Sequence, residues 1–281
     1  MTFDGRRSSS ERVTGDGVFE VVVDGYDAVY PAVAASPTFR RLWTEHAYGG
    51  PFPAEFAHIS FLTLDELQTM AAHLALAEGS VLADLACGAG GPGLWVAAES
   101  GASVVGVDPS TTGLVAARQR AEALGLADRA RYQAGTFAQT GLADAAIDAV
   151  LSVDAIQYAP DKRAVFREIS RIMRPGARLA FSAFEVEPDR VEGLPVLGVD
   201  PVPDFGPLLE ESELAVDWYR ESDGWAERIP ATFAAVVEAM PTLTEEMGEV
   251  AASSLGLEAS LTLQFRPYRR RVVVAAHAPA A

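Results

Sequence analysis

Short apolar runs alternate with amphipathic stretches along the chain from residue 80 to residue 185. The apolar runs are rich in β-branched residues and predict five strands, at Val81–Leu85, Val104–Val107, Arg131–Ala134, Ala149–Val153 and Arg178–Phe184. The amphipathic stretches between them predict helices over residues 91–100, 110–124 and 161–173. Strands that alternate with helices in this way are typical of a parallel sheet with helices on both faces.

The pattern changes after Glu185. Residues 187–207 are rich in proline and glycine, which indicates a loop, and a short helix (208–212) and a strand (214–219) follow. A long helical stretch over residues 226–256, interrupted at Pro241, precedes a last strand at 271–276. We therefore expect an α/β fold with a doubly wound, mostly parallel seven-stranded sheet and a helical lid inserted between its last two strands.

Two further helices are predicted ahead of the sheet, over Tyr26–Glu45 and Thr63–Ala77. The second begins with Thr63-Leu64-Asp65-Glu66, which has the form of a capping box. The polar N-terminus lacks the apolar centre of a signal peptide and is interpreted as a disordered leader. The expected organisation is a leader (1–20), an N-terminal helical cap (21–78), a doubly wound core (79–185), a loop with a short helix and the sixth strand (186–225), a helical substrate lid (226–268), and a final strand with a tail (269–281).

Composition excludes several classes of protein. The net charge of −17 argues against nucleic acid and anionic membranes as partners, and no apolar run is long enough for a membrane span. The basic cluster at residues 266–271 is interpreted as solvated charge at a sheet edge. Cys87 is the one cysteine, and the four histidines lack metal-site spacing, so we expect no metal and a reducing, cytoplasmic setting.

A glycine-rich turn follows the first predicted strand, in the segment DLACGAGGPG that begins at Asp84. Its GxGxxG spacing, with Asp108 at the end of the next strand, also occurs in dinucleotide-binding folds. Asp84 argues against a dinucleotide, because a buried carboxylate would repel a pyrophosphate by about 3 kcal/mol at about 5 Å and an effective dielectric of about 20. A ligand with an ammonium group and no phosphate would instead be attracted, and S-adenosylmethionine is such a ligand.

Four segments resemble the successive motifs of class I S-adenosylmethionine-dependent methyltransferases, namely VLADLACGAGGPG, VVGVDPS, AVLSVDAIQYAPD and REISRIMRPGARLAFS. The resemblance is close over about residues 60–185. The segment LWTEHAYGGPFPAEFAHISF is further similar to small-molecule methyltransferases of actinomycete secondary metabolism. The resemblance implies a Rossmann-like core, S-adenosylmethionine as cofactor and S-adenosylhomocysteine as product.

The resemblance also implies roles for individual residues. It places the methionine end of the cofactor at Asp84, Ala86, Gly88 and Gly90, and the ribose at Asp108. The adenine would lie at Pro109, Gly135, Thr136 and Phe137. The reacting methyl would lie near Ser152, Asp154, Gln157 and Tyr158. Three positions depart from the family. Ala86 replaces a glycine, which is a mild change if its φ is negative. Thr136 replaces a common aspartate, and Gln157-Tyr158 stands where some sugar O-methyltransferases have two histidines.

Methyl transfer to an alcohol requires a positioned nucleophile and a group that accepts its proton. His58 and His46 lie in the expected cap and are the candidate bases, with Tyr158 as an orienting group. His73 is expected to be structural and His277 exposed. The aromatic residues of the cap and lid predict an apolar substrate pocket that includes Tyr26, Tyr30, Trp43, Phe56, Tyr158, Trp225 and Phe233.

The sequence thus predicts a methyltransferase that acts on a small-molecule acceptor, with O-methylation favoured over N- or C-methylation. Three alternatives stay open. A protein of this fold could bind S-adenosylmethionine and catalyse a cyclisation or rearrangement without methyl transfer. It could instead be a non-catalytic binding module. A dehydrogenase is the weakest alternative. The expected partner is a small-molecule substrate, with no nucleic acid or membrane partner, and the chain is expected to be a monomer or a homodimer.

Overall fold

A seven-stranded sheet forms the centre of the protein in the computed structural model, which describes residues 15–191, 200–265 and 269–280. The strand order is β3-β2-β1-β4-β5-β7-β6, with parallel pairing through β5 and antiparallel pairing of β7 with both neighbours. This arrangement confirms the predicted fold class. The strands are β1 (Val81–Leu85), β2 (Ser103–Asp108), β3 (Ala130–Ala134), β4 (Ile147–Val153), β5 (Met173–Val186), β6 (Ala215–Glu221) and β7 (Arg269–His277).

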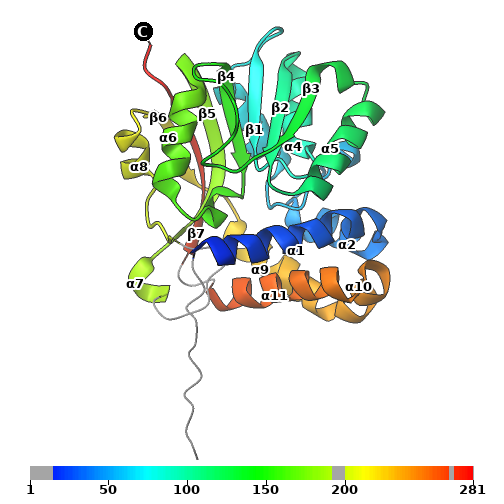
Figure 1. Ribbon diagram of the computed structural model, residues 1–281. Coiled ribbons are helices and arrows are strands. Elements are labelled where there is room, and N and C mark those ends of the chain that lie inside the picture. Colours follow the sequence, from blue (N-terminus) through cyan, green and yellow to red (C-terminus); the bar gives the residue numbers. More distant parts are fainter. Residues whose placement is uncertain (1–14, 192–199, 266–268, 281) are drawn as a thin grey trace, which may run out of the picture.

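Helices cover both faces of the sheet, and their ends follow local sequence signals (Figure 1). Thr63 caps its helix through a complete capping box with Glu66, as expected. Ser110 and Asp161 cap two later helices, Thr111–Ala123 and Lys162–Ile172, by accepting backbone N–H groups three residues later. The helices around the sheet are α3 (Leu64–Leu74), α4 (Gly91–Ser100), α5 (Thr111–Ala123), α6 (Lys162–Ile172) and α8 (Gly206–Glu211).

A separate helical layer lies across one end of the strands (Figure 1). It combines the N-terminal cap with the lid between β6 and β7, and apolar side chains of both form one buried cluster. Phe39, Trp225 and Phe233 belong to this cluster, so the cap and the lid share a core of their own. The layer consists of α1 (Gly15–Ala35), α2 (Pro37–Leu42), a π-helix (Trp43–Ala47), α9 (Trp225–Glu238), α10 (Met240–Met247) and α11 (Glu249–Phe265).

Several expected boundaries differ from the structure. The predicted helix Tyr26–Glu45 is broken at Ser36, because Pro37 cannot donate a hydrogen bond and disfavours helical geometry in the residue before it. Helix α1 already begins at Gly15, so the expected leader is too long, and residues 1–14 lie outside the described residues. Part of the expected loop after Glu185 forms α7 (Pro188–Val191), and α11 extends the lid helices to Phe265.

Arg269, Arg270 and Arg271, the part of the basic cluster that the structure describes, belong to the last strand and do not lie at a sheet edge, whereas residues 266–268 lie outside the described residues. Strand β7 lies between β5 and β6, and Arg271 is completely buried. Arg270 pairs with Glu185, and the guanidinium of Arg269 lies 4.6 Å from the ring centre of Phe184. In the described part of the chain no helix is both long enough and apolar enough to cross a membrane.

Candidate active site

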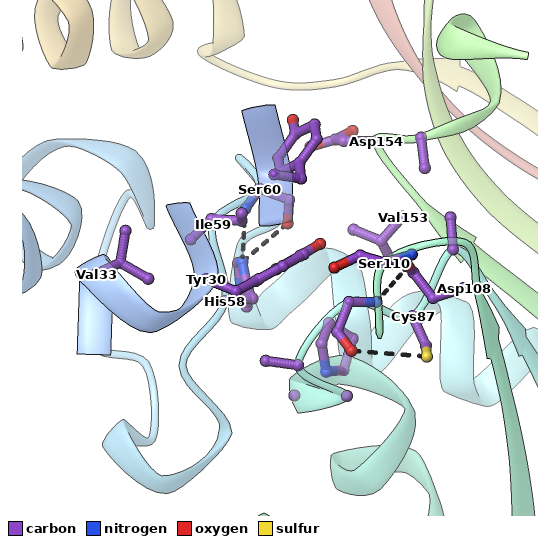
Figure 2. Close-up of a pocket in the computed structure, with 18 of the residues that line it drawn as sticks. Tyr30, Val33, His58, Ile59, Ser60, Cys87, Asp108, Ser110, Val153 and Asp154 are labelled. Carbon is purple, nitrogen blue, oxygen red and sulfur yellow. Dashed lines mark hydrogen bonds between the residues drawn. The ribbon is translucent and has the colours of Figure 1, made fainter. Parts of the chain in front are cut away.

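A cavity of about 440 Å³ lies between the carboxyl ends of the parallel strands and the helical layer. Its floor comes from the loops after β1, β2 and β4, and its roof comes from α1, the segment around residues 52–61 and α11. Figure 2 shows Tyr30 and His58 from the cap facing Cys87 and Asp108 from the sheet. The carboxyl edge is where ligands bind in doubly wound sheets.

The glycine turn after β1 is tight because three of its residues have positive φ. Gly88 and Gly90 have φ of +50° and +75°, and Ala86 has φ of +55°. The condition under which alanine would be a mild replacement, a negative φ, is therefore not met, and Ala86 in place of glycine carries backbone strain. The N–H of Ala86 donates to the carbonyl of Val107 at 2.7 Å, which fixes the start of the turn.

Asp84 is buried at the end of β1, beside the first turn of α4. A Cβ on Gly93 would lie 2.3 Å from the Asp84 carboxylate, so only glycine lets the helix approach it. Burial and, to a smaller extent, the nearby Asp108 carboxylate together raise the pKa of Asp84 to about 8, although the N–H of Gly93 opposes the shift. No arginine, lysine or histidine forms an ion pair with Asp84 in the described part of the chain.

Asp108 lies at the end of β2 and accepts two backbone hydrogen bonds. The N–H of Gly88 donates to Oδ2 at 2.7 Å, and the N–H of Ser110 donates to Oδ1 at 2.8 Å. Burial nevertheless raises its pKa to about 6. Each carboxylate oxygen has two acceptor positions, so Asp108 can still accept hydroxyl donors from a ligand.

These features fit the S-adenosylmethionine that the sequence resemblance implies. Two buried carboxylates border one cavity, and neither forms an ion pair among the residues that the structure describes. A ligand with an ammonium group, a sulfonium and a ribose supplies positive charge and hydroxyl donors, whereas a pyrophosphate would add repulsion. Pro109 and Phe137 also line the cavity, with apolar surfaces suited to a nucleoside base.

Not every residue expected at the cofactor reaches the cavity. Gln157 lines it, whereas Gly135, Thr136 and Ser152 do not. The Ser152 hydroxyl is fully buried and donates to the carbonyl of Leu85 at 3.0 Å. Gly135 packs against Val107, and a Cβ there would lie 2.7 Å from that side chain. Ser152 and Gly135 therefore pack behind the loops that line the cavity, and Thr136 pairs with Gln139.

Asp154 borders the cavity, but its carboxylate is occupied by the protein. Its Oδ1 accepts from Arg271 Nε at 2.9 Å and from the Ser182 hydroxyl at 2.7 Å, and its Oδ2 accepts from the Phe61 N–H at 2.9 Å. Arg271 outweighs burial and lowers the pKa of Asp154. Arg271 also binds Glu66 at 2.8 Å. Asp154 therefore joins β4, β5, β7 and the cap, and its expected contact with the cofactor is not supported by its bonding.

The two candidate histidine bases differ in position, and neither has the chemistry expected of it. His58 lines the cavity, and burial lowers its pKa to about 3. The backbone N–H of Ser60 donates to His58 Nδ1 at 3.3 Å, so the proton of the neutral ring is on Nε2 and neither nitrogen is free to accept another. His46 is partly exposed near Glu45 and does not line the cavity.

Three polar side chains, Tyr26, Tyr158 and Glu258, form a group at the lid side of the cavity, and the sequence analysis did not identify Glu258. The hydroxyls of Tyr26 and Tyr158 are 3.3 Å apart, and the Tyr158 hydroxyl donates to Glu258 Oε1 at 3.4 Å. Burial raises the pKa of Glu258 to about 7, while Arg269 opposes the shift. The only sequence signal for Glu258 is an acidic residue within an otherwise apolar helical run, LGLEASL.

The aromatic residues expected in the substrate pocket separate into two sets. Tyr26, Tyr30, Trp43 and Tyr158 line the cavity. Phe56, Trp225 and Phe233 do not, because their rings are buried in the packing of the cap, the lid and α4. His73 stacks on Trp218, and His277 is only partly exposed because it pairs with Asp217. The apolar wall of the cavity is instead completed by residues not singled out before, including Phe19, Val22, Val23 and Phe184.

Comparison with known proteins finds similarity to methyltransferases. Residues 83–181 match the family model described as "Methyltransferase domain". Methyltransferase GfsG of Streptomyces halstedii is 27% identical over an alignment of 255 residues. The alignment covers 86% of this chain and 88% of that protein. The 27-O-demethylrifamycin SV methyltransferase of Amycolatopsis mediterranei (strain S699) is 29% identical over 58% of each chain.

Solved structures share the fold over most of the chain. The [4+2]-cyclase SpnF superposes with a TM-score of 0.72 at 18% identity, covering 98% of this chain and 100% of that one. Geranyl diphosphate C-methyltransferase from Streptomyces coelicolor A3(2), solved with S-adenosylhomocysteine, gives a TM-score of 0.62 at 17% identity, covering 92% and 97%. Residues 83–181 thus match a methyltransferase domain, and the whole chain is similar in sequence and fold to Rossmann-like methyltransferases that act on small molecules.

Proposed function

We propose that the protein methylates a hydroxyl group of a largely apolar small molecule of the natural-product type. The observation that carries this proposal is the Tyr26–Tyr158–Glu258 group, which lies in an otherwise apolar part of the cavity that also contains Asp84 and Asp108. A proton acceptor and a cofactor site in one cavity are what transfer to an alcohol requires.

The residues that line the cavity have separate roles in this proposal. When bound, S-adenosylmethionine supplies a methyl group on a positively charged sulfur, which a nucleophile can displace. Asp84 and Asp108 would hold the two polar ends of the cofactor, with the turn residues Ala86, Gly88 and Gly90 allowing close backbone approach. The helical layer excludes water, and Pro109 and Phe137 would bound the base.

Glu258 is the group we assign to accept the acceptor's proton. Its carboxylate would receive the proton at Oε1, either directly or through the Tyr158 hydroxyl that already donates to it. A carboxyl with a pKa of about 7 is near the range in which general bases are effective at neutral pH. This assignment replaces the histidine bases expected from the sequence.

The nature of the acceptor follows from the walls of the cavity. Phe19, Val22, Val23 and Phe184 offer apolar surface, and the relatives include a methyltransferase named for 27-O-demethylrifamycin SV. A polyketide-like alcohol is the acceptor class that these features favour over an amine or a carbon nucleophile, because an amine would need no general base of this kind.

The test is a turnover assay with S-adenosylmethionine and a panel of polyketide alcohols that includes 27-O-demethylrifamycin SV. We expect a methyl ether and an equal amount of S-adenosylhomocysteine, with a rate that rises with pH up to about 7. Conversion of an acceptor without S-adenosylhomocysteine would favour cyclisation or rearrangement, and methylation only of amines or carbons would contradict the proposal.

Two lid variants sharpen the assay. Glu258→Gln should lower the turnover number at least about a hundredfold while leaving cofactor affinity intact, as loss of a general base does. Glu249→Gln, on the exposed start of the same helix, is the matched control and should keep full activity. Equal activity of the two variants would remove Glu258 from the mechanism.

A further inference from the structure

Tyr30 of α1 lies directly over the glycine turn. A Cβ on Gly88 would be 2.3 Å from the Tyr30 hydroxyl, and a Cβ on Gly113 would be 3.0 Å from the opposite side of the ring, at Cε2. The two edges of the phenol are thus held by the turn after β1 and by the start of α5. This leaves a ring face to border the cavity that Tyr30 lines.

The surroundings of Tyr30 place it between the two carboxylates of the site. Burial raises its pKa, and Asp108, Cys87, Tyr158 and Asp84 raise it further. Figure 2 shows the ring extending from α1 toward Ser110 and Asp108. Tyr26, one turn earlier, lies 5.8 Å away between ring centres and instead bonds toward Tyr158 and the lid.

The order of groups along the cofactor predicts which of them would lie against the free face of the Tyr30 ring. A ligand held at one end by Asp84 and at its ribose by Asp108 would span the turn that contains Gly88, whose N–H itself donates to Asp108. In S-adenosylmethionine the atom between the amino-acid chain and the ribose is the sulfonium sulfur. We propose that Tyr30 contacts this sulfonium, so that its ring favours the charged cofactor over the neutral thioether product.

The physical basis is the attraction between a cation and the face of an aromatic ring. Such contacts are worth more when both partners are removed from water, as they would be here. S-adenosylhomocysteine lacks the positive charge but has the same shape apart from one methyl group. Tyr30 would therefore act on the ratio of the two affinities, and through it on product release, rather than on the acceptor as the sequence analysis expected.

The test is calorimetric titration of wild type, Tyr30→Leu and Tyr30→Phe with S-adenosylmethionine and S-adenosylhomocysteine. In Tyr30→Leu the preference for S-adenosylmethionine should fall about fivefold relative to wild type, the size of a moderate cation–π contact. Tyr30→Phe keeps the ring and should retain most of that preference. Val21→Leu, at an exposed position of the same helix outside the cavity, is the matched control and should leave the ratio of affinities unchanged.

Replacement of Tyr30 by pentafluorophenylalanine provides a second measurement if the leucine variant does not fold. This ring keeps the shape of phenylalanine but reverses its electrostatic attraction for cations, so the ratio should fall as in Tyr30→Leu. Equal losses for both ligands, or a gain for both, would show that Tyr30 only packs against or obstructs the site.

The inference rests on S-adenosylmethionine being the cofactor, but not on the identity of the acceptor. Wild-type protein that binds neither ligand would overturn the cofactor assignment together with the role of Tyr30. Binding with an unchanged ratio in every variant would overturn the role of Tyr30 alone. Failure to find an acceptor leaves these titrations interpretable, because none of them requires turnover.

Discussion

Asp84 and Asp154 end two adjacent strands of the sheet, β1 and β4, yet their surroundings are opposite. Both carboxylates are buried and border the same cavity. Asp154 receives three hydrogen bonds, one of them from the buried Arg271, and its pKa is lowered. Asp84 has no cationic partner in the described chain, and its pKa is raised to about 8.

The difference separates a structural carboxylate from one kept for a ligand. The charge of Asp154 is compensated when the chain folds, so removing it leaves the buried Arg271 with only one of its two carboxylate partners, Glu66. The charge of Asp84 has no described ion-pair partner until a cationic ligand binds. Removing the carboxylate should therefore not lower the stability of the folded protein, but it should lower the affinity for the ligand. The same aspartate-to-asparagine substitution at the two sites should therefore have opposite consequences.

The largest effect is expected for the stability of Asp154→Asn. This substitution removes the negative charge facing Arg271, and we expect the free energy of unfolding to fall by about 3 kcal/mol. The value lies at the low end for a broken buried pair because Glu66 still binds Arg271. Urea unfolding monitored by circular dichroism measures it, with Asp84→Asn as the matched control that should be no less stable than wild type at pH 7.

An equal loss of stability in both variants would contradict the comparison, since it would mean that Asp84 is also compensated within the fold. A double variant that also replaces Arg271 with methionine refines the test. If the loss comes from the unpaired guanidinium, the second substitution should recover part of it.

The second effect is on cofactor affinity. Asp84→Asn should weaken S-adenosylmethionine binding about a hundredfold, because the ligand loses a charged hydrogen-bond partner in a buried site. Asp108→Ala should also weaken binding strongly, while the fold of both variants stays largely intact. Calorimetry checks this, and unchanged affinity in both variants would disprove the assignment of the two acids to the cofactor.

The third effect is a pH dependence that runs in opposite directions for folding and binding. Asp84 has a raised pKa, so its contribution to stability is complete below pH 3.8, the ordinary value, and is lost as pH rises toward about 8. A cation binds the ionised form, so affinity for S-adenosylmethionine should rise with pH over the same window and level off above about 8.

Titration calorimetry in buffers of different ionisation enthalpy should detect the proton released on binding at pH 7. Asp84→Asn should remove most of this release, leaving only what Asp108, with its pKa of about 6, contributes at lower pH. Proton uptake in the wild type, or a release unchanged in the variant, would be inconsistent with a protonated Asp84 in the free protein.

The comparison also explains how much could be predicted from the sequence. Asp84, the glycine turn and Asp108 lie within 25 residues of one another, in strand–turn–helix patterns that local sequence specifies, so the fold and the meeting of these residues at one cavity were predictable. The partner of Asp154 is 117 residues away, and Glu66 is 205 residues from Arg271. No local pattern encodes such pairs, so Asp154 was assigned to the ligand and the arginines to a sheet edge.

The acceptor side was harder to predict for a related reason. Trp225 and Phe233 resemble pocket residues by type, but the cap and lid form a second core that buries them. Glu258 reaches the cavity only because α11 packs against α1 and brings the carboxylate to Tyr158. Which face of a lid helix meets the cavity depends on packing between segments more than two hundred residues apart, and residue type alone does not determine it.

The smallest effect concerns one donor to the structural carboxylate. Ser182→Ala removes a hydroxyl that donates to Asp154 Oδ1 and accepts from the Asp154 N–H, which also reaches the Ser182 carbonyl at 2.9 Å. We expect the free energy of unfolding to fall by about 1 kcal/mol, as for loss of one buried hydrogen bond, because Arg271 and Phe61 keep the carboxylate satisfied. Affinity for S-adenosylmethionine should not change, since Ser182 does not line the cavity. Parallel unfolding and titration experiments decide the matter: a variant with normal stability and weakened binding would mean that Asp154 serves the cofactor after all.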